Sequence, residues 1–254
     1  MNDEYMDFDG KVVLITGATA GIGRATALAF AKRGARLVIG DMAEAAEETA
    51  AACRDLGTEA VYLKTNVSET ADVQALVNLA DSRFNGLDVA FNNAGILPAT
   101  KPLADVTEAE FDRILAVDLR GVFLSMKYEI PLMLRSGGGA IINTSSVAGV
   151  VADPGMAPYA AAKHGVAGLT RAAALDYATQ NIRINALAPG LIETPMTQRW
   201  LADPEISASL MANSPMKRAA KPEEIAATVL LLASPGATFV NGAVFVADGG
   251  QTAH

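Results

Sequence analysis

Seven short apolar runs alternate along the chain with amphipathic helical segments, and this alternation constrains the fold more than any other feature of the sequence. Several runs, such as VVLI and LVI, are apolar throughout. Strands that alternate with helices form βαβ units, and strands without polar positions are buried on both faces. We therefore expect an α/β fold in which a single doubly wound domain, residues 1–254, has a parallel sheet covered on both sides. The expected strands are 11–16, 36–40, 60–64, 88–92, 140–145, 182–188 and 243–247, and the expected helices are 22–33, 43–56, 69–84, 107–135, 158–180 and 222–234.

The charge balance and the cysteine content argue against several classes of function. Lys and Arg number 20 against 28 Asp and Glu, a net charge of −8, so binding to nucleic acid or to anionic lipid is not expected. Cys53 is the one cysteine, so no internal disulfide can form, and no neighbouring residue suggests a metal site. The N-terminal residues are acidic and every apolar run is too short to span a bilayer. We expect no signal peptide, no membrane segment and a cytoplasmic location.

A glycine-rich turn follows the first expected strand and leads into a helix. Its residues of interest are Gly17, Thr19, Gly21, Ile22 and Gly23. Glycines let the backbone approach a pyrophosphate, which binds at the helix N-terminus. The second strand ends at Asp41, where an acid meets the ribose hydroxyls of an adenine dinucleotide and repels a 2′-phosphate. NAD is therefore the expected cofactor, and the alternative is that Asp41 only caps the next helix.

Tyr159 precedes Lys163 by four residues in a helix otherwise rich in alanine. Side chains at i and i+4 share one face of a helix, and a nearby ammonium favours the phenolate. We expect Lys163 to lower the pKa of Tyr159, which is normally about 10, so that the phenol can act as a general acid–base group near neutral pH. By itself the pair would equally describe a half-buried Tyr beside a solvated Lys.

Five motifs, in order, make the sequence similar to the short-chain dehydrogenase/reductase family, classical type, over nearly the whole chain. They are Gly17-x3-Gly21-x-Gly23, Asn92-Asn93-Ala94-Gly95, Ser146 followed by Tyr159 and Lys163, Pro189-Gly190-x3-Thr194, and Asp248-Gly249-Gly250. The resemblance implies a seven-stranded sheet of the Rossmann type and a nicotinamide cofactor. It also implies a homotetramer, the usual assembly of the family.

The resemblance further implies roles for individual residues. Tyr159 would exchange a proton with the substrate oxygen, Lys163 would hold the nicotinamide ribose, and Ser146 would orient the substrate oxygen. Ser145 and His164 should point away from the site. The other expected cofactor-binding residues are those of the glycine-rich turn, Asp41, Asn66, Val67, Asn92, Asn93, Ala94, Gly95, Pro189, Gly190, Ile192 and Thr194.

Asp118 departs from the family pattern, which has a catalytic Asn in this context. In the family the Asn holds a water that links the Lys to solvent. An Asp carboxylate can accept from the same water but cannot donate while it is ionised. Its charge would also offset part of the effect of Lys163 on Tyr159, unless burial keeps Asp118 protonated and therefore similar to Asn. Asn66 replaces a usual Asp and can still hydrogen-bond near the adenine.

The stretch 191–218 differs from the rest of the chain, with three prolines, three methionines and the only tryptophan. We expect one or two short helices that form a substrate lid. Candidates for the substrate pocket, or for packing of the lid alone, are Met156, Met196, Trp200 and Met211.

The leading hypothesis is an NAD(H)-dependent oxidoreductase that interconverts a secondary alcohol and a ketone. Because the lid is apolar, its substrate should be a small to medium, uncharged molecule, cyclic alcohols included. The alternatives are an NADPH-dependent reductase of carrier-linked 3-ketoacyl groups and a non-catalytic dinucleotide-binding protein.

Overall fold

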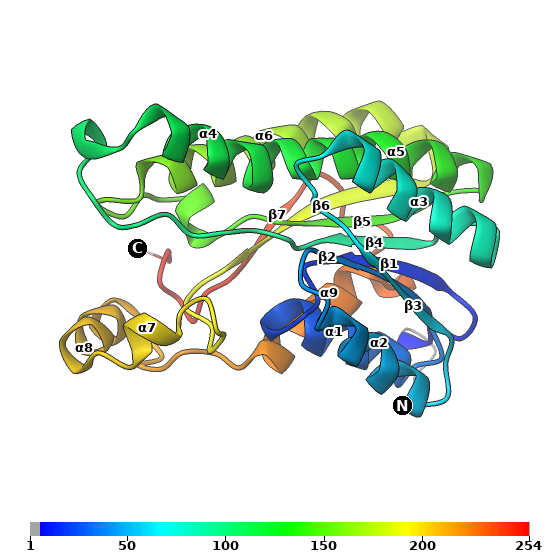
Figure 1. Ribbon diagram of the computed structural model, residues 1–254, viewed down its shortest axis with the longest axis horizontal. Helices are drawn as coiled ribbons and strands as arrows, with labels where there is room; N and C mark the ends of the chain where they lie inside the picture. The colour runs from blue at the N-terminus through cyan, green and yellow to red at the C-terminus, as the bar shows by residue number, and fades with distance from the viewer. Residues whose placement is uncertain (1–5, 254) are drawn as a thin grey trace.

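A seven-stranded parallel sheet runs through the computed structural model, which describes residues 6–253 (Figure 1). The expectation that the N-terminal residues form no signal peptide therefore concerns a segment that lies largely outside the described residues. The strands are β1 (Val12–Thr16), β2 (Arg36–Asp41), β3 (Ala60–Lys64), β4 (Val89–Asn92), β5 (Gly139–Thr144), β6 (Ile182–Pro189) and β7 (Val244–Ala247), in the order β3-β2-β1-β4-β5-β6-β7. The doubly wound α/β fold expected from the sequence is confirmed.

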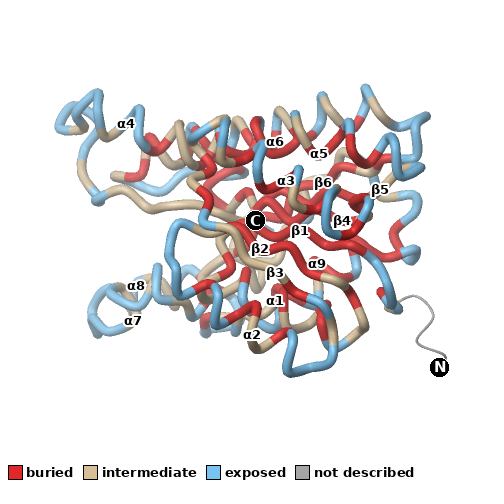
Figure 2. Tube along the Cα trace, turned by 45° about the vertical axis from the view of Figure 1, so that its right-hand side comes forward, coloured by how far each residue is buried: buried red, intermediate tan, exposed pale blue. Residues whose placement is uncertain are grey.

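Helices cover both faces of this sheet (Figure 1). One face carries α1 (Gly21–Ala31), α2 (Ala46–Asp55) and α9 (Pro222–Ala233), and the other carries α3 (Thr70–Phe84), α4 (Glu108–Leu115), α5 (Gly121–Arg135) and α6 (Ala157–Tyr177). Alternate residues of β1 enter opposite cores: Val13 and Ile15 pack on the α1 side, Val12 and Leu14 on the α3 side. Buried residues consequently run through the middle of the molecule, with exposed residues on the outer faces of the helices (Figure 2).

The expected helix over 107–135 is interrupted. Thr107 begins α4 with a capping box, in which its side chain accepts from the backbone of Glu110 and its own backbone donates to the Glu110 carboxylate. A π-helical turn, Ala116–Arg120, then separates α4 from α5. A π turn inserts one residue into the helix and is frequent at functional sites. Here it places the side chain of Asp118, which is fully buried, toward the interior.

The strand order reverses between β1 and β4, which are neighbours in the sheet but not in the sequence. Such a reversal opens a crevice beyond the carboxyl ends of the strands, where α/β proteins bind ligands. The stretch 191–218 lies at this end and contains the two short helices α7 (Gln198–Leu201) and α8 (Pro204–Asn213) (Figure 1). Within residues 6–253, no helix combines the length and apolar character needed to cross a membrane.

Candidate active site

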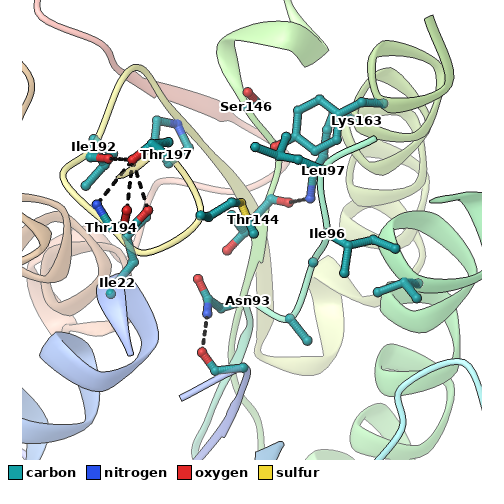
Figure 3. A pocket seen from close by; sticks show the side chains of 18 of the residues that line it. Ile22, Asn93, Ile96, Leu97, Thr144, Ser146, Lys163, Ile192, Thr194 and Thr197 are labelled. Atoms are coloured by element: carbon teal, nitrogen blue, oxygen red, sulfur yellow. Dashed lines mark hydrogen bonds between the residues drawn. The ribbon is translucent and has the colours of Figure 1, made fainter. Parts of the chain in front are cut away.

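A cavity of about 670 Å³ occupies the crevice at the carboxyl ends of the strands, between the sheet and the segment 191–218 (Figure 3). Asp41 and Met42 line it at the end of β2, and Met196 and Trp200 line it from the region of α7. Most residues expected to form a site meet here. They are Gly17, Gly21, Ile22, Asp41, Asn66, Val67, Asn93, Ala94, Gly95, Ser146, Met156, Tyr159, Lys163, Pro189, Gly190, Ile192, Thr194, Met196 and Trp200.

The glycine-rich turn forms one wall of the cavity. Gly17 has a φ of +71°, and a Cβ atom there would lie 2.7 Å from the Cα atom of Ala94, so the β1 and β4 loops can approach this closely only with glycine. Ala20, the N-cap residue of α1, has no side-chain group that could cap the helix. The first turn of α1 lines the cavity at Gly21 and Ile22, so its uncapped N–H groups and the helix dipole provide an anion site there. Gly23 does not line the cavity; it packs against the carbonyl of Gly17.

Asp41 is held rigidly at the edge of the cavity. Its Oδ2 accepts from the backbone N–H of Thr19 at 2.9 Å, and its Oδ1 accepts from that of Ala43 at 3.0 Å. Thr19 does not line the cavity; its contribution to the site is the backbone N–H that holds the Asp41 carboxylate in place. Because α2 begins only at Ala46, Asp41 is not its N-cap. A carboxylate has about four lone-pair directions, so both oxygens can still accept from a ligand hydroxyl.

Ser146 and Lys163 lie on the wall opposite Ile22 (Figure 3), and Tyr159 lines the cavity with them. Ser146 follows β5, and its Oγ accepts from the backbone N–H of Ala148 at 3.1 Å. Lys163 Nζ donates to the carbonyl of Thr144 at 3.0 Å and lies 5.4 Å from the centre of the Tyr159 ring. The i, i+4 spacing thus brings phenol and ammonium together as expected.

The side chains of the two residues expected to point away are both hydrogen-bonded to backbone carbonyls, although Ser145 is among the residues that line the cavity. The buried Ser145 donates from Oγ to the carbonyl of Lys163 at 3.0 Å, which ties the end of β5 to α6. The exposed His164 pairs through Nδ1 with the carbonyl of Ala160 at 2.9 Å. Both contacts are internal to the framework that supports Tyr159.

The net direction of the pKa shift of Tyr159 is opposite to the expected one. Burial raises the pKa above 10.0, and this outweighs the opposing effect of the Lys163 ammonium; Asp118 raises the pKa further, and the Ser146 hydroxyl lowers it. The prediction from the Tyr–Lys spacing was therefore wrong about the net direction. The reason is that an i, i+4 pattern shows the neighbouring charge but not the depth of burial.

Asp118 lies beneath the cavity wall and does not line it. Its Oδ1 accepts from the backbone N–H of Ile96 at 2.8 Å, and its Oδ2 is buried without a partner among the described residues. Burial raises the pKa of Asp118, against the smaller effects of Lys163 and of the N–H of Ile96. This is the direction that favours a protonated, Asn-like side chain.

Two expected residues are not where the sequence suggested. Met211 does not line the cavity, because α8 presents the neighbouring Leu210 to it. Asn92 is only 2% exposed, and its side chain turns into the core, toward Glu129. Neither the face of an isolated short helix nor the direction of the last side chain in a strand is encoded by a local motif.

Several lining residues were not found by sequence reasoning. They include Ile96, Leu97, Arg113, Val117, Val147, Ala148, Asp153, Leu191, Thr197, Leu210 and Gln251. Thr197 has a clear structural part, since its Oγ1 donates to the carbonyl of Ile192 and pairs with Thr194, and so shapes the loop after β6 (Figure 3). The one available signal was position, because Leu97 and Val117 adjoin motifs already identified.

The cavity fits a nicotinamide dinucleotide. The close approach of Gly17 to Ala94, the open N-terminus of α1 and the fixed carboxylate of Asp41 correspond to a pyrophosphate and an adenosine ribose. Thr194 lies beside Gly21, and Lys163 lines the opposite wall (Figure 3). In residues 6–253, no three His, Cys, Asp or Glu side chains come together as metal ligands would.

Known proteins resemble this chain over almost its whole length. A family model described as "Enoyl-(Acyl carrier protein) reductase" matches residues 17–252. The cis-4-hydroxycyclohexanecarboxylate dehydrogenase of Sinomonas cyclohexanicum is 44% identical and covers 97% of this chain and 98% of its own. The cyclohexanol dehydrogenase of Acinetobacter sp. (strain SE19) is also 44% identical, with 96% of both chains covered.

The solved structure of levodione reductase superposes with a TM-score of 0.93 at 41% identity, covering 97% of this chain and 99% of that one. The relatives and the cavity geometry agree with the motifs, so this chain belongs to the short-chain dehydrogenase/reductase family, whose members bind a nicotinamide dinucleotide.

Proposed function

We propose that the protein is an NAD(H)-dependent dehydrogenase that interconverts a secondary alcohol and a ketone on a small to medium, uncharged, cyclic substrate. The observation that carries this proposal is the position of Ser146, Tyr159 and Lys163 on one wall of a cavity whose far end holds Asp41. Two relatives are named for substrates that contain a cyclohexane ring, which supports a cyclic substrate here.

When bound, the nicotinamide supplies hydride transfer, and the side chains supply position and proton movement. The phenolate of Tyr159 takes the hydroxyl proton of the alcohol during oxidation, and the phenol so formed returns a proton to the substrate oxygen during reduction. Ser146 Oγ donates a hydrogen bond to the substrate oxygen and so holds it within reach of the phenol. The ammonium of Lys163 stabilises the phenolate against the burial that raises the pKa of Tyr159.

The preference for an uncharged substrate follows from the side chains near Tyr159. Leu97, Val147, Met156, Trp200 and Leu210 line the cavity, and Arg113 and Asp153 are the charged side chains outside the cofactor motifs that line it with them. An apolar ring buries its surface against such side chains, whereas an unpaired carboxylate would lose hydration there.

We assign the segment 191–218 as the lid, in a single catalytic domain of residues 1–254.

The preference for NAD over NADP rests on the charge of Asp41, which faces the position of an adenosine 2′-phosphate. Replacing the ribose hydroxyl with a phosphate would place two anions side by side.

We also infer a homotetramer in the cytoplasm, supported by family membership and by exposed apolar side chains such as Phe123, Leu175 and Phe239. A monomeric mass in solution light scattering would contradict the tetramer.

A screen of cyclic and open-chain secondary alcohols, with the appearance of NADH as the signal, tests the function. We expect turnover of cyclohexanol with NAD, and weaker turnover of its 4-carboxylate. The description of the matching family model names an acyl group on a carrier protein, and a carrier-linked substrate is the part that it shares with one alternative, an NADPH-dependent reductase of carrier-linked 3-ketoacyl groups. Turnover confined to carrier-linked substrates with NADPH would establish that alternative, and tight NADH binding without any turnover would indicate a non-catalytic dinucleotide-binding protein.

A further inference from the structure

A polar cluster lies in the core behind the cavity and takes no part in the chemistry above. It joins Glu129 of α5, Asn92 of β4, Asn143 of β5 and Thr170 of α6, each at most 2% exposed. Asn92 Nδ2 donates to Glu129 Oε2 and to Asn143 Oδ1, both at 3.0 Å, and Asn143 Nδ2 donates to Thr170 Oγ1 at 3.0 Å. The cluster thus connects two helices through the ends of two central strands.

Two atoms of this cluster have no hydrogen-bond partner among the described residues, namely Glu129 Oε1 and Asn92 Oδ1. With an ionised Glu129 both atoms are acceptors, so neither can satisfy the other. One proton on Oε1 supplies the missing donor. Its O–H can then donate to Asn92 Oδ1 while Asn92 Nδ2 donates to Oε2, the reciprocal pair that a carboxylic acid forms with an amide.

The surroundings of Glu129 also favour the neutral form. Burial raises its pKa to about 7, and the only opposing influence is the hydrogen bond from Asn92. The π turn Ala116–Arg120, the helix α3 and the strands β4, β5 and β6 pack against α5. None of the charged side chains on these elements, Asp118 and Arg120 included, acts on this carboxyl group. A buried carboxylate without a cation or a full set of donors is costly.

We propose that Glu129 is a neutral carboxylic acid paired with the amide of Asn92, and that this pair positions the cofactor cleft from behind. Asn92 is followed directly by Asn93, whose Nδ2 donates to the carbonyl of Gly17 at 2.8 Å. Glu129 therefore acts through the end of β4 on the wall that receives the pyrophosphate.

The second branch of the cluster leads to the catalytic wall. Asn143 directly precedes Thr144, whose carbonyl accepts from Lys163 Nζ at 3.0 Å. Fixing Asn143 between Asn92 and Thr170 fixes this carbonyl, and with it the ammonium beside Tyr159. Glu129 is thus a positioning residue for both walls, and the cofactor part of the inference rests on the proposed function.

Two substitutions at Glu129 distinguish a role of the acid–amide hydrogen bonds from a role of the side chain's volume alone. Glu129→Gln offers an N–H in place of the O–H, so it should keep both hydrogen bonds and leave the dissociation constant of NADH unchanged. Glu129→Met has a similar size but leaves Asn92 Oδ1 without a donor and removes one of the two acceptors of Asn92 Nδ2, so NADH binding should weaken by about three- to tenfold. Glu108→Gln, the same change at an exposed position of α4, is the matched control.

Infrared spectroscopy reads the proton directly. At a pH well below 7 the wild type should show a protonated-carboxyl band that is absent from Glu129→Gln and present in Glu108→Gln, and the band should fade as the pH rises through about 7. Identical spectra for the wild type and Glu129→Gln, or equal NADH affinities for the Gln and Met variants, would overturn the proposal. Failure of the wild type to bind NADH would instead contradict the proposed function, and the infrared band would still decide the state of Glu129.

Discussion

Replacing Asp41 with Ala should remove most of the preference for NAD over NADP. Two unit charges about 4 Å apart near a protein surface interact by up to about 4 kcal/mol. Solvation and salt leave about a third of this, which corresponds to about a tenfold preference. The carboxylate cannot turn away from a 2′-phosphate, because the N–H groups of Thr19 and Ala43 hold its two oxygens at 2.9 and 3.0 Å.

The variant should gain affinity for NADP and lose affinity for NAD, because the ribose hydroxyls lose a charged acceptor worth about 1.5–3 kcal/mol. The assay compares kcat/KM for the two cofactors with cyclohexanol, at low and at high salt. Asp153→Ala is the matched control. It removes a carboxylate that lines the same cavity but lies in the segment between Ser146 and Tyr159, away from Asp41 in the sequence. A wild type that prefers NADP, or an unchanged ratio in Asp41→Ala, would refute the reasoning.

Four further predictions concern the catalytic wall, the lid and the core. Tyr159→Phe should abolish turnover with NADH binding largely intact, whereas Lys163→Ala should impair both; an active Tyr159→Phe enzyme would contradict the mechanism. Trp200→Ala should raise KM or change substrate preference more than it changes NADH affinity, and unaltered kinetics across the panel would assign Trp200 to packing. Asp118→Asn should keep activity and move the acidic limb of the kcat profile for oxidation to lower pH, because an ionised Asp118 raises the pKa of Tyr159. Superimposable profiles would show that Asp118 is protonated in the folded enzyme, the direction that its burial favours, and that no charge at this position is felt by the phenol. Glu129 keeps its proton in the folded state up to about pH 7 but loses it near pH 4.5 when unfolded, so the wild type should lose up to about 3 kcal/mol of stability relative to Glu129→Gln as pH rises across this window. Parallel urea-unfolding curves for the two proteins at every pH would contradict this last prediction.

The strands and most of the site could be predicted from the sequence because both depend on short stretches of chain. Apolar runs bounded by turns placed β1 to β7 within one or two residues, and motifs at strand ends identified Gly17, Asp41 and Ser146 as neighbours at one edge. Parallel strands bring their carboxyl ends to the same edge whatever their order in the sheet. A local pattern therefore sufficed to predict which residues meet there.

Only the tertiary structure determined how deeply these groups are buried and what faces them. The sequence showed the ammonium of Lys163 beside Tyr159, but burial by other segments sets the net direction of the pKa shift. It showed a helical pattern over 107–135, but not the π turn that buries Asp118. The pairing of Glu129 with Asn92 joins residues 37 positions apart. Such contacts depend on the register of β4 and β5 and on how α5 packs against them, and no short stretch of sequence encodes either.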